Sequence, residues 1–145
     1  MEISTIGFTQ KSAEEFFTIL REAGIKRLID VRRRNQSQLA GFTKQADLSY
    51  FLRELCQVEY EHEPRLAPTA ELMTAYRRQE IGWPEYQARF LQLLAERQAA
   101  TFLAKERWIK PTVLLCSEPS AEHCHRRLVA EYLQEAWGDV VIRHL

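Results

Sequence analysis

The beginning of the chain alternates between short apolar runs and an amphipathic segment, and this alternation constrains the fold more than any other feature. Residues 2–6 are a β-prone run, and residues 26–31 are a second run of the buried-strand type. Between them, Ser12 and Glu15 have the spacing of a capping box, and Gly24 is placed to end the helix. A strand, a helix and a strand in this order predict a βαβ unit with parallel strands and a right-handed crossover.

The same alternation continues to the end of the chain. It predicts a single α/β domain over residues 1–145, built as a three-layer sandwich with a mostly parallel sheet and helices on both faces. Within the helix over residues 44–56, Leu55 is expected to face the core together with Leu48, Phe51 and Leu52. Another expected helix covers residues 69–79, with Thr69 as its cap. The next begins at residue 83, with Pro84 in its first turn, and ends near Arg97 or runs on to Trp108. The last expected helix covers residues 121–136, and the other expected strands cover residues 58–62, 112–116 and 140–142.

The composition is that of an ordinary globular domain. The 145 residues are 46% hydrophobic and 28% charged, which is enough to bury a core. Lys plus Arg and Asp plus Glu number 20 each, so bulk charge gives no attraction for nucleic acid. No signal peptide is recognisable, and no apolar run approaches the ~20 residues that cross a bilayer. An odd number of cysteines favours reduced thiols, so we expect a cytoplasmic location and no membrane partner.

Polar and reactive residues follow the predicted strands. In parallel sheets, ligands bind beyond the carboxyl ends of the strands. Because these ends share one edge of the sheet, the residues that follow them should converge, whatever motif each belongs to. The residues in question are Asp30, Arg32, His62, Cys116 and Glu118.

The stretch over residues 113–128 has the pattern of a strand, a loop and a helix. Ser120 is placed to cap the helix, so we expect the helix to begin close to Ser120, with Cys124 in its first turn. A helix N-terminus carries partial positive charge, and Arg126 and Arg127 add to it. Such a place attracts an anion or lowers a thiol pKa, and we therefore expect the Cys124 thiol to be more acidic than a free thiol.

These patterns give each candidate residue a role. Guanidinium groups bind phosphate bidentately, so the expected anion ligands are Arg32 and Arg126, facing one cleft together with Glu118. The loop over residues 32–42 is expected to cover this cleft, while Arg33 and Arg34 have the simpler interpretation of a solvated loop. Side chains for nucleophilic or acid–base work are Cys124, His125 and Glu118, and the supporting residues are Asp30, His62 and Cys116.

A metal centre is the less favoured interpretation of the cysteines. Cys116, Cys124 and His125, with or without His62, offer zinc-type ligands, but the cysteines are separated by seven residues, which is not a zinc-finger spacing. Two adjacent residues on a helix also point about 100° apart. We therefore expect no metal and no other cofactor, and reduced thiols rather than a disulfide between the two cysteines.

Three functions remain open at this point. The first is an enzyme that acts on a phosphorylated, nucleotide-like or nucleic-acid-derived substrate. The second is a non-catalytic module that binds a nucleotide or a nucleic-acid end at the same edge. The third is cysteine-dependent sulfur or redox transfer, although a rhodanese-like loop would be shorter and richer in glycine than residues 116–126.

Several segments resemble those of a bacterial and archaeal family called domain of unknown function 488. The resemblance implies an α/β fold with a site at these segments, and it implies no reaction, because the family has none assigned. Many members have His-Ser where this chain has Phe8-Thr9, so a role of that histidine is absent here or belongs to another residue. The similar segments are Thr5-Ile6-Gly7, residues 28–32, residues 60–64, Cys116-Ser117-Glu118 and Cys124-His125-Arg126.

Overall fold

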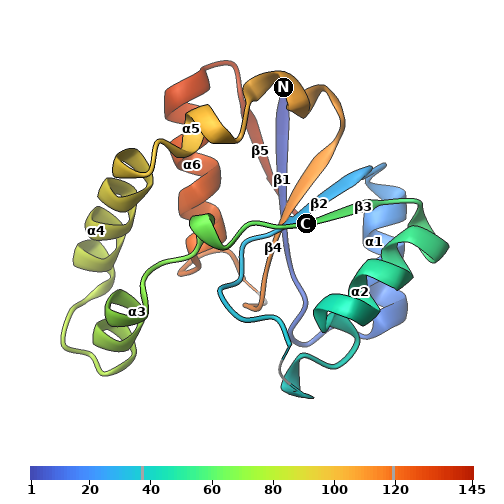
Figure 1. Ribbon diagram of the computed structural model, residues 1–145, viewed down its shortest axis with the longest axis horizontal. Coiled ribbons are helices and arrows are strands. Elements are labelled where there is room, and N and C mark those ends of the chain that lie inside the picture. The colour runs from blue at the N-terminus through green and yellow to red at the C-terminus, as the bar shows by residue number, and fades with distance from the viewer. Residues whose placement is uncertain (37, 119) are drawn as a thin grey trace.

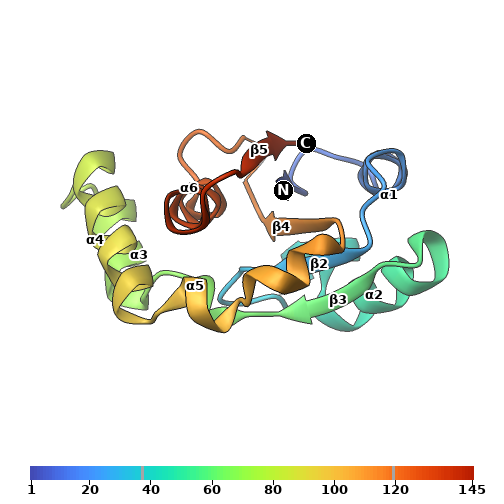
Figure 2. The same cartoon turned by 90° about the horizontal axis from the view of Figure 1, so that it is seen from above.

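The computed structural model describes residues 1–36, 38–118 and 120–145, with the backbone alone for residues 38–40. Within these residues five strands form one parallel sheet in the order β3-β2-β4-β1-β5. Helices cover both faces of the sheet, which confirms the predicted three-layer α/β fold (Figures 1 and 2). The strands are β1 (Glu2–Gly7), β2 (Arg27–Asp30), β3 (Glu59–His62), β4 (Thr112–Cys116) and β5 (Val141–His144).

The central strand is β4, which pairs with β1 on one side and with β2 on the other. Leu114 of β4 lies opposite Thr5 of β1 and opposite Ile29 of β2, and both pairings are parallel. All five residues of β4 are buried, because a central strand between two helical layers has no solvent-facing side. The predicted parallel sheet and the predicted bounds of this strand are therefore confirmed.

Helices α1 (Ala13–Glu22) and α2 (Gln45–Phe51) cover one face of the sheet. The capping box of Ser12 and Glu15 is present at the start of α1, as predicted. A π-helical turn, Leu52–Cys56, extends α2 and changes which side chains face the core. Because a π-helix has more residues per turn than an α-helix, Cys56 is buried after Leu52, and Leu55 is 50% exposed. The expectation that Leu55 faces the core is wrong.

The other face is covered by the helices of the second half of the chain. Thr69 caps the first of them through its side chain, and Pro84 lies in the first turn of the second, both as predicted. Phe90 and Leu128 from these helices pack with Ile29 of the sheet in one buried cluster. The helices are α3 (Ala70–Arg77), α4 (Trp83–Glu96), α5 (Ala99–Phe102) and α6 (His125–Trp137), and short 3-10 turns cover Gln38–Thr43, Pro64–Leu66 and Lys105–Ile109.

The chain leaves neighbouring strands toward opposite faces at the carboxyl end of β4. Strands β1 and β2 are followed by α1 and α2 on one face, whereas β4, which lies between them, is followed by α6 on the other face. A crevice forms where such connections diverge, and ligands of open α/β sheets bind there. The topology thus places the candidate site at the end of β4.

A buried ion pair fixes the carboxyl end of β2. The Nε and Nη2 atoms of Arg32 each lie 2.8 Å from a carboxylate oxygen of Asp30, and the Tyr60 hydroxyl donates to the same carboxylate at 2.6 Å. Burial alone would raise the pKa of Asp30, but the hydrogen bonds and the charge of Arg32 outweigh it, and the pKa is lowered. Arg32 also donates to Thr43, so its guanidinium group is fully engaged in structure.

Replacement of Asp30 by Asn should lower the free energy of unfolding at pH 7 by about 3–5 kcal/mol, because it leaves the charge of Arg32 buried and unpaired. Urea unfolding measures this loss. Glu63→Gln is the control, because the ion-pair partner of Glu63, Arg65, is 59% exposed. An exposed ion pair contributes little, so the free energy of unfolding of this variant should fall by less than about 1 kcal/mol.

The pH dependence of the same pair follows from the direction of the shift. The pKa of Asp30 is lower in the folded protein than in the unfolded chain. The ionised carboxylate therefore stabilises the fold fully at a pH above the pKa of the unfolded chain, and this stabilisation is lost as the pH falls through the pKa of the folded protein. The difference in stability between the wild type and Asp30→Asn should therefore shrink in acid. A difference that stays constant down to acid unfolding, or equal losses in the Asp30 and Glu63 variants, would contradict this role of the ion pair.

Candidate functional site

A cavity of about 430 Å³ opens at the carboxyl end of β4, where the topology places a crevice. Its walls come from the segment after β2, from α3, from α4 and from the segment between β4 and α6. Its volume suits a small ligand. The lining residues are Arg32, Arg33, Arg34, Ala70, Met73, Thr74, Tyr76, Arg77, Tyr86, Cys116, Ser117, Glu118, His123, Cys124 and His125.

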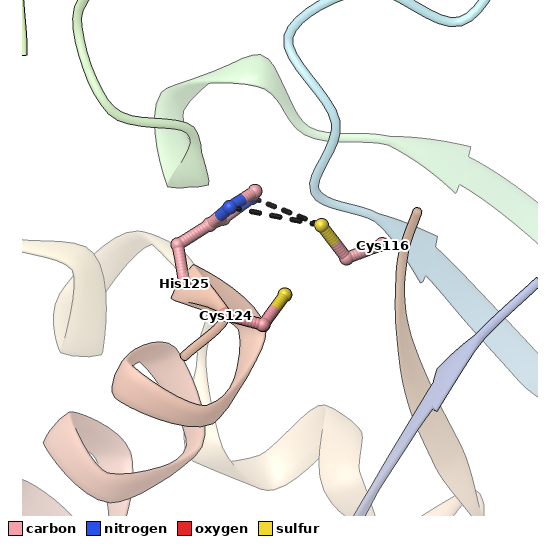
Figure 3. A group of neighbouring side chains, drawn as sticks. All are labelled: Cys116, Cys124 and His125. Atoms are coloured by element: carbon pink, nitrogen blue, oxygen red, sulfur yellow. Dashed lines mark hydrogen bonds between the residues drawn. The ribbon is translucent and has the colours of Figure 1, made fainter. Parts of the chain in front are cut away.

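Two thiols and an imidazole meet at the floor of this cavity (Figure 3). Cys116 is the last residue of β4, Cys124 immediately precedes α6, and His125 is the first residue of α6. The Cys116 Sγ atom lies 3.6 Å from His125 Nδ1, and the potential ligand atoms of the three residues all lie within 4.8 Å of one another. We call these three residues the thiol–imidazole cluster.

The imidazole of His125 is held in one orientation. Its Nε2 atom lies 3.0 Å from the carbonyl oxygen of Val31, and Phe90 packs against the ring in an edge-on arrangement with centroids 5.8 Å apart. A carbonyl oxygen only accepts hydrogen bonds, so Nε2 carries the proton in the neutral ring. The Nδ1 atom of His125 is then left as an acceptor, and the Cys116 Sγ atom lies at nearly equal distances from Nδ1 and Nε2, 3.6 and 3.7 Å.

Cys116, and not Cys124, is the more acidic thiol. The hydrogen bond with Cys124 lowers the pKa of Cys116 against the effect of burial, and the backbone N–H groups of Ser117 and Glu118 and the charge of Arg126 lower it further. The same hydrogen bond, together with burial, raises the pKa of Cys124. The prediction of an acidic Cys124 is wrong, because the neighbouring Cys116 and burial raise the pKa of its thiol.

Helix α6 begins at His125 and not close to Ser120. The Ser120 hydroxyl accepts a hydrogen bond from the Glu122 N–H at 3.1 Å, so it closes a local turn before the helix instead of capping it. Pro119, which the sequence places in the same turn, lies outside the described residues. Cys124 has an extended backbone, with φ −126° and ψ 140°. Cys124 and His125 are therefore not successive residues of one helix, and their side chains can converge on Cys116.

Arg126 holds the segment between β4 and α6 in place. Its guanidinium group is buried and donates to the Glu118 carbonyl oxygen at 2.7 Å and to Thr5 Oγ1 at 3.3 Å, and its Nη1 atom lies 3.6 Å from Cys124 Sγ. Arg126 does not line the cavity. The prediction that Arg32, Glu118 and Arg126 face one cleft is wrong for Arg126, and Arg32 lines the cavity with its guanidinium group paired to Asp30. The Glu118 side chain is exposed at the cavity.

The remaining predicted residues support the cavity from outside. The His62 Nε2 atom lies 2.7 Å from the carbonyl oxygen of Arg32, so His62 fixes the backbone that follows β2. His62 and Asp30 do not line the cavity. Among the side chains of the loop over residues 32–42 that the structure describes, only Arg32, Arg33 and Arg34 line the cavity, while Phe42 packs against Phe16 on the opposite face of the sheet. Ser37 of this loop lies outside the described residues.

Three exposed arginines at the cavity were not identified as ligands from the sequence. Arg33 and Arg34 follow β2, and Arg77 lies in the last turn of α3. None of the three forms an ion pair with any residue that the structure describes. Arg33 and Arg34 could have been identified as ligands from the sequence, because they follow a predicted strand. The sequence around Arg77 carries no such signal, because only the tertiary fold brings α3 to this edge.

Gly7 at the end of β1 allows the segment after β4 to approach. A Cβ atom at this position would lie 1.6 Å from the Glu118 carbonyl oxygen and 2.9 Å from Arg126 Nη1. The Thr9 N–H group donates to the Ser117 carbonyl oxygen at 3.0 Å and completes the contact. A side chain at position 7 is therefore incompatible with the observed path of this segment.

The chain matches the family model described as domain of unknown function DUF488 over residues 12–133. It belongs to this family. The matched range of this DUF488 protein contains the thiol–imidazole cluster and the three exposed arginines. No curated protein and no solved structure matches the chain. In the part of the chain that the structure describes, no helix is both long and apolar enough to cross a membrane.

Gly7→Ala should lower the free energy of unfolding by about 1–3 kcal/mol, as overpacking of a closed structure does, and should displace the backbone of Ser117 and Glu118. Chemical denaturation measures the loss. The control is Gly82→Ala, because a Cβ atom there meets only Pro84 Cδ at 3.7 Å, an ordinary contact. Similar stability changes in the two variants would show that the close approach at Gly7 does not matter.

Proposed function

We propose that the cavity binds a small phosphorylated or nucleotide-like ligand and holds its reacting group over the thiol–imidazole cluster. The observation that carries this proposal is a set of exposed guanidinium groups around one cavity, those of Arg33, Arg34 and Arg77, which form no ion pair with the described residues. Arginine binds phosphate oxygens bidentately, and three guanidinium groups outweigh the Glu118 carboxylate at the cavity, which favours an anionic ligand.

The shape and the charge of the protein point to a small ligand and not to a long polyanion. The cavity volume of about 430 Å³ lies within the range of small-molecule sites. Acidic and basic residues are equal in number, so the positive charge at the cavity is local. Binding of duplex nucleic acid gains most of its affinity from many phosphate contacts, which such a surface does not offer.

An aromatic wall gives the cavity an apolar side. Tyr76 and Tyr86 both line it, with ring centroids 4.7 Å apart, and Met73 lies beside them on α3. His123, which also lines the cavity, packs against Trp83 with centroids 4.8 Å apart. A cavity lined by both guanidinium groups and aromatic rings fits a ligand with an anionic group and a flat apolar part.

The chemistry proposed for this site is acid–base catalysis of hydrolysis. The Glu118 carboxylate is exposed at the cavity, while its carbonyl oxygen is fixed by Arg126. In this position the carboxylate would take a proton from a water molecule whose oxygen attacks a phosphorus atom of the bound ligand. The bond from that phosphorus to the leaving oxygen breaks, and the leaving group departs as an alcohol or a phosphate that takes up the proton. A non-catalytic binding module would use the same arginines, and it differs from an enzyme only in having no turnover.

Arg77→Gln should weaken the binding of pyrophosphate or a nucleoside diphosphate by about tenfold or more. A hydrogen bond to a charged group contributes about 1.5–3 kcal/mol, and 1.4 kcal/mol corresponds to a factor of ten. Isothermal titration calorimetry at low salt measures the affinity. Arg78→Gln is the matched control, because Arg78 is the adjacent exposed arginine and does not line the cavity. Equal affinities of the two variants, or no binding of any tested phosphate compound by the wild type, would refute the proposal.

Glu118→Gln separates the enzyme from the binding module. The variant should bind the phosphate compounds found by calorimetry as tightly as the wild type or slightly tighter, because it removes a negative charge from the cavity. If the protein hydrolyses one of them, turnover should fall by about 10²–10⁴-fold, the usual contribution of a general acid or base. Release of inorganic phosphate is the measurement. Binding with no turnover in the wild type would identify a binding module, and unchanged turnover in the variant would exclude Glu118 as the base.

A further inference from the structure

The thiol–imidazole cluster has the composition of a metal centre. Cysteine sulfur and histidine nitrogen are the preferred ligands of zinc, and a set of three protein ligands with a fourth position left open is typical of catalytic zinc sites. Cys116, Cys124 and His125 supply two sulfurs and one nitrogen from two structural elements that meet at the cavity floor (Figure 3).

We propose that Cys116, Cys124 and His125 bind one zinc ion, with the fourth coordination position open to the cavity. This goes beyond the proposed function, which names a ligand for the arginines and no metal. The objection from the sequence, that adjacent helical residues diverge, does not apply here, because Cys124 is extended and precedes the helix.

The distances between the ligand atoms suit a tetrahedral ion. Bonds of about 2.3 Å to sulfur and 2.0–2.1 Å to nitrogen at a tetrahedral angle put S and N about 3.6 Å apart and two S atoms about 3.8 Å apart. The Cys116 Sγ atom lies 3.6 Å from His125 Nδ1, and no pair of ligand atoms in the cluster exceeds 4.8 Å. Ligand atoms farther apart than about 3.8 Å would have to move closer together when the ion binds.

The surroundings hold these side chains in the form that a metal requires. A ligating histidine usually donates its other ring N–H to a carbonyl or carboxylate, and His125 Nε2 lies 3.0 Å from the Val31 carbonyl oxygen. Nε2 also lies 3.7 Å from Cys116 Sγ, but the carbonyl is nearer and is the stronger acceptor. On the other side, Arg126 Nη1 lies 3.6 Å from Cys124 Sγ, as an outer donor to a sulfur ligand.

Charge balance is compatible with the bound ion. Two thiolates and one divalent cation sum to zero, so the loaded centre would add no net charge next to the buried guanidinium of Arg126. The soft sulfur ligands favour zinc over magnesium or calcium, which prefer oxygen. All three ligands line the cavity, so the fourth position is accessible to water or to an oxygen of the bound ligand.

Cobalt substitution tests the site on the purified full chain. The wild type, treated with a chelator and titrated with Co²⁺, should bind one equivalent and show the sulfur-to-cobalt charge-transfer band of a thiolate complex. Cys116→Ser and Cys124→Ser should each weaken binding by more than the 10–100-fold that the loss of an outer partner typically costs. Cys56→Ser is the control, because Cys56 is buried on the opposite face of the sheet, with its Sγ atom 3.7 Å from the Phe17 carbonyl oxygen.

A measurement on the wild type covers the case in which a cysteine variant does not fold. X-ray absorption of the zinc-loaded protein should show two sulfur neighbours at about 2.3 Å and nitrogen or oxygen at about 2.0–2.1 Å. A shell of nitrogen and oxygen alone, no stoichiometric binding by the wild type, or cobalt bands that persist in folded Cys124→Ser would each overturn the proposal. Arg77→Gln should keep the cobalt spectrum while it loses anion affinity, so the metal site and the anion site can fail independently.

Discussion

The buried guanidinium group of Arg126 is the interaction on which the site depends. It joins β1 to the distant segment between β4 and α6, because it donates to Thr5 on β1 and to the Glu118 carbonyl oxygen, and it lies against Cys124 at the start of α6. Gly7 leaves the space in which this contact forms. With the segment after β4 held in this way, Cys124 and His125 come to lie beside Cys116 at the bottom of a cavity.

The arginines near the site divide into two groups by burial. Arg32 and Arg126 are buried and satisfied by carboxylate, hydroxyl, carbonyl and thiol groups of the protein itself. The desolvation cost of a buried charge requires such partners, and a side chain engaged in this way has little left to offer a ligand. Exposed arginines carry no such cost, and those that border the cavity keep their hydrogen-bonding capacity. Proximity to a predicted site therefore does not by itself make an arginine a ligand.

Local patterns predicted most of the fold. The capping box at Ser12, the cap at Thr69 and the apolar run of β4 depend on neighbouring residues, and all three are found as predicted. Leu55 was misplaced because a π-helical turn breaks the regular period, and the start of α6 was misplaced because Ser120 closes a turn instead. The partners of Arg126, the position of Arg77 and the convergence of the two thiols depend on contacts across the sheet edge, which a local pattern does not contain.

The central claim is that an anion binds in the cavity at the end of β4, over the thiol–imidazole cluster. A crystal soaked in tungstate, a heavy analogue of phosphate, tests this most directly, because anomalous scattering locates the ion without a search for the natural ligand. We predict a tungstate peak within hydrogen-bonding distance of Arg77 and of the segment that contains Arg33 and Arg34, on the cavity side of Cys116. Tungstate bound only at other arginines of the surface, with none in the cavity, would contradict the account.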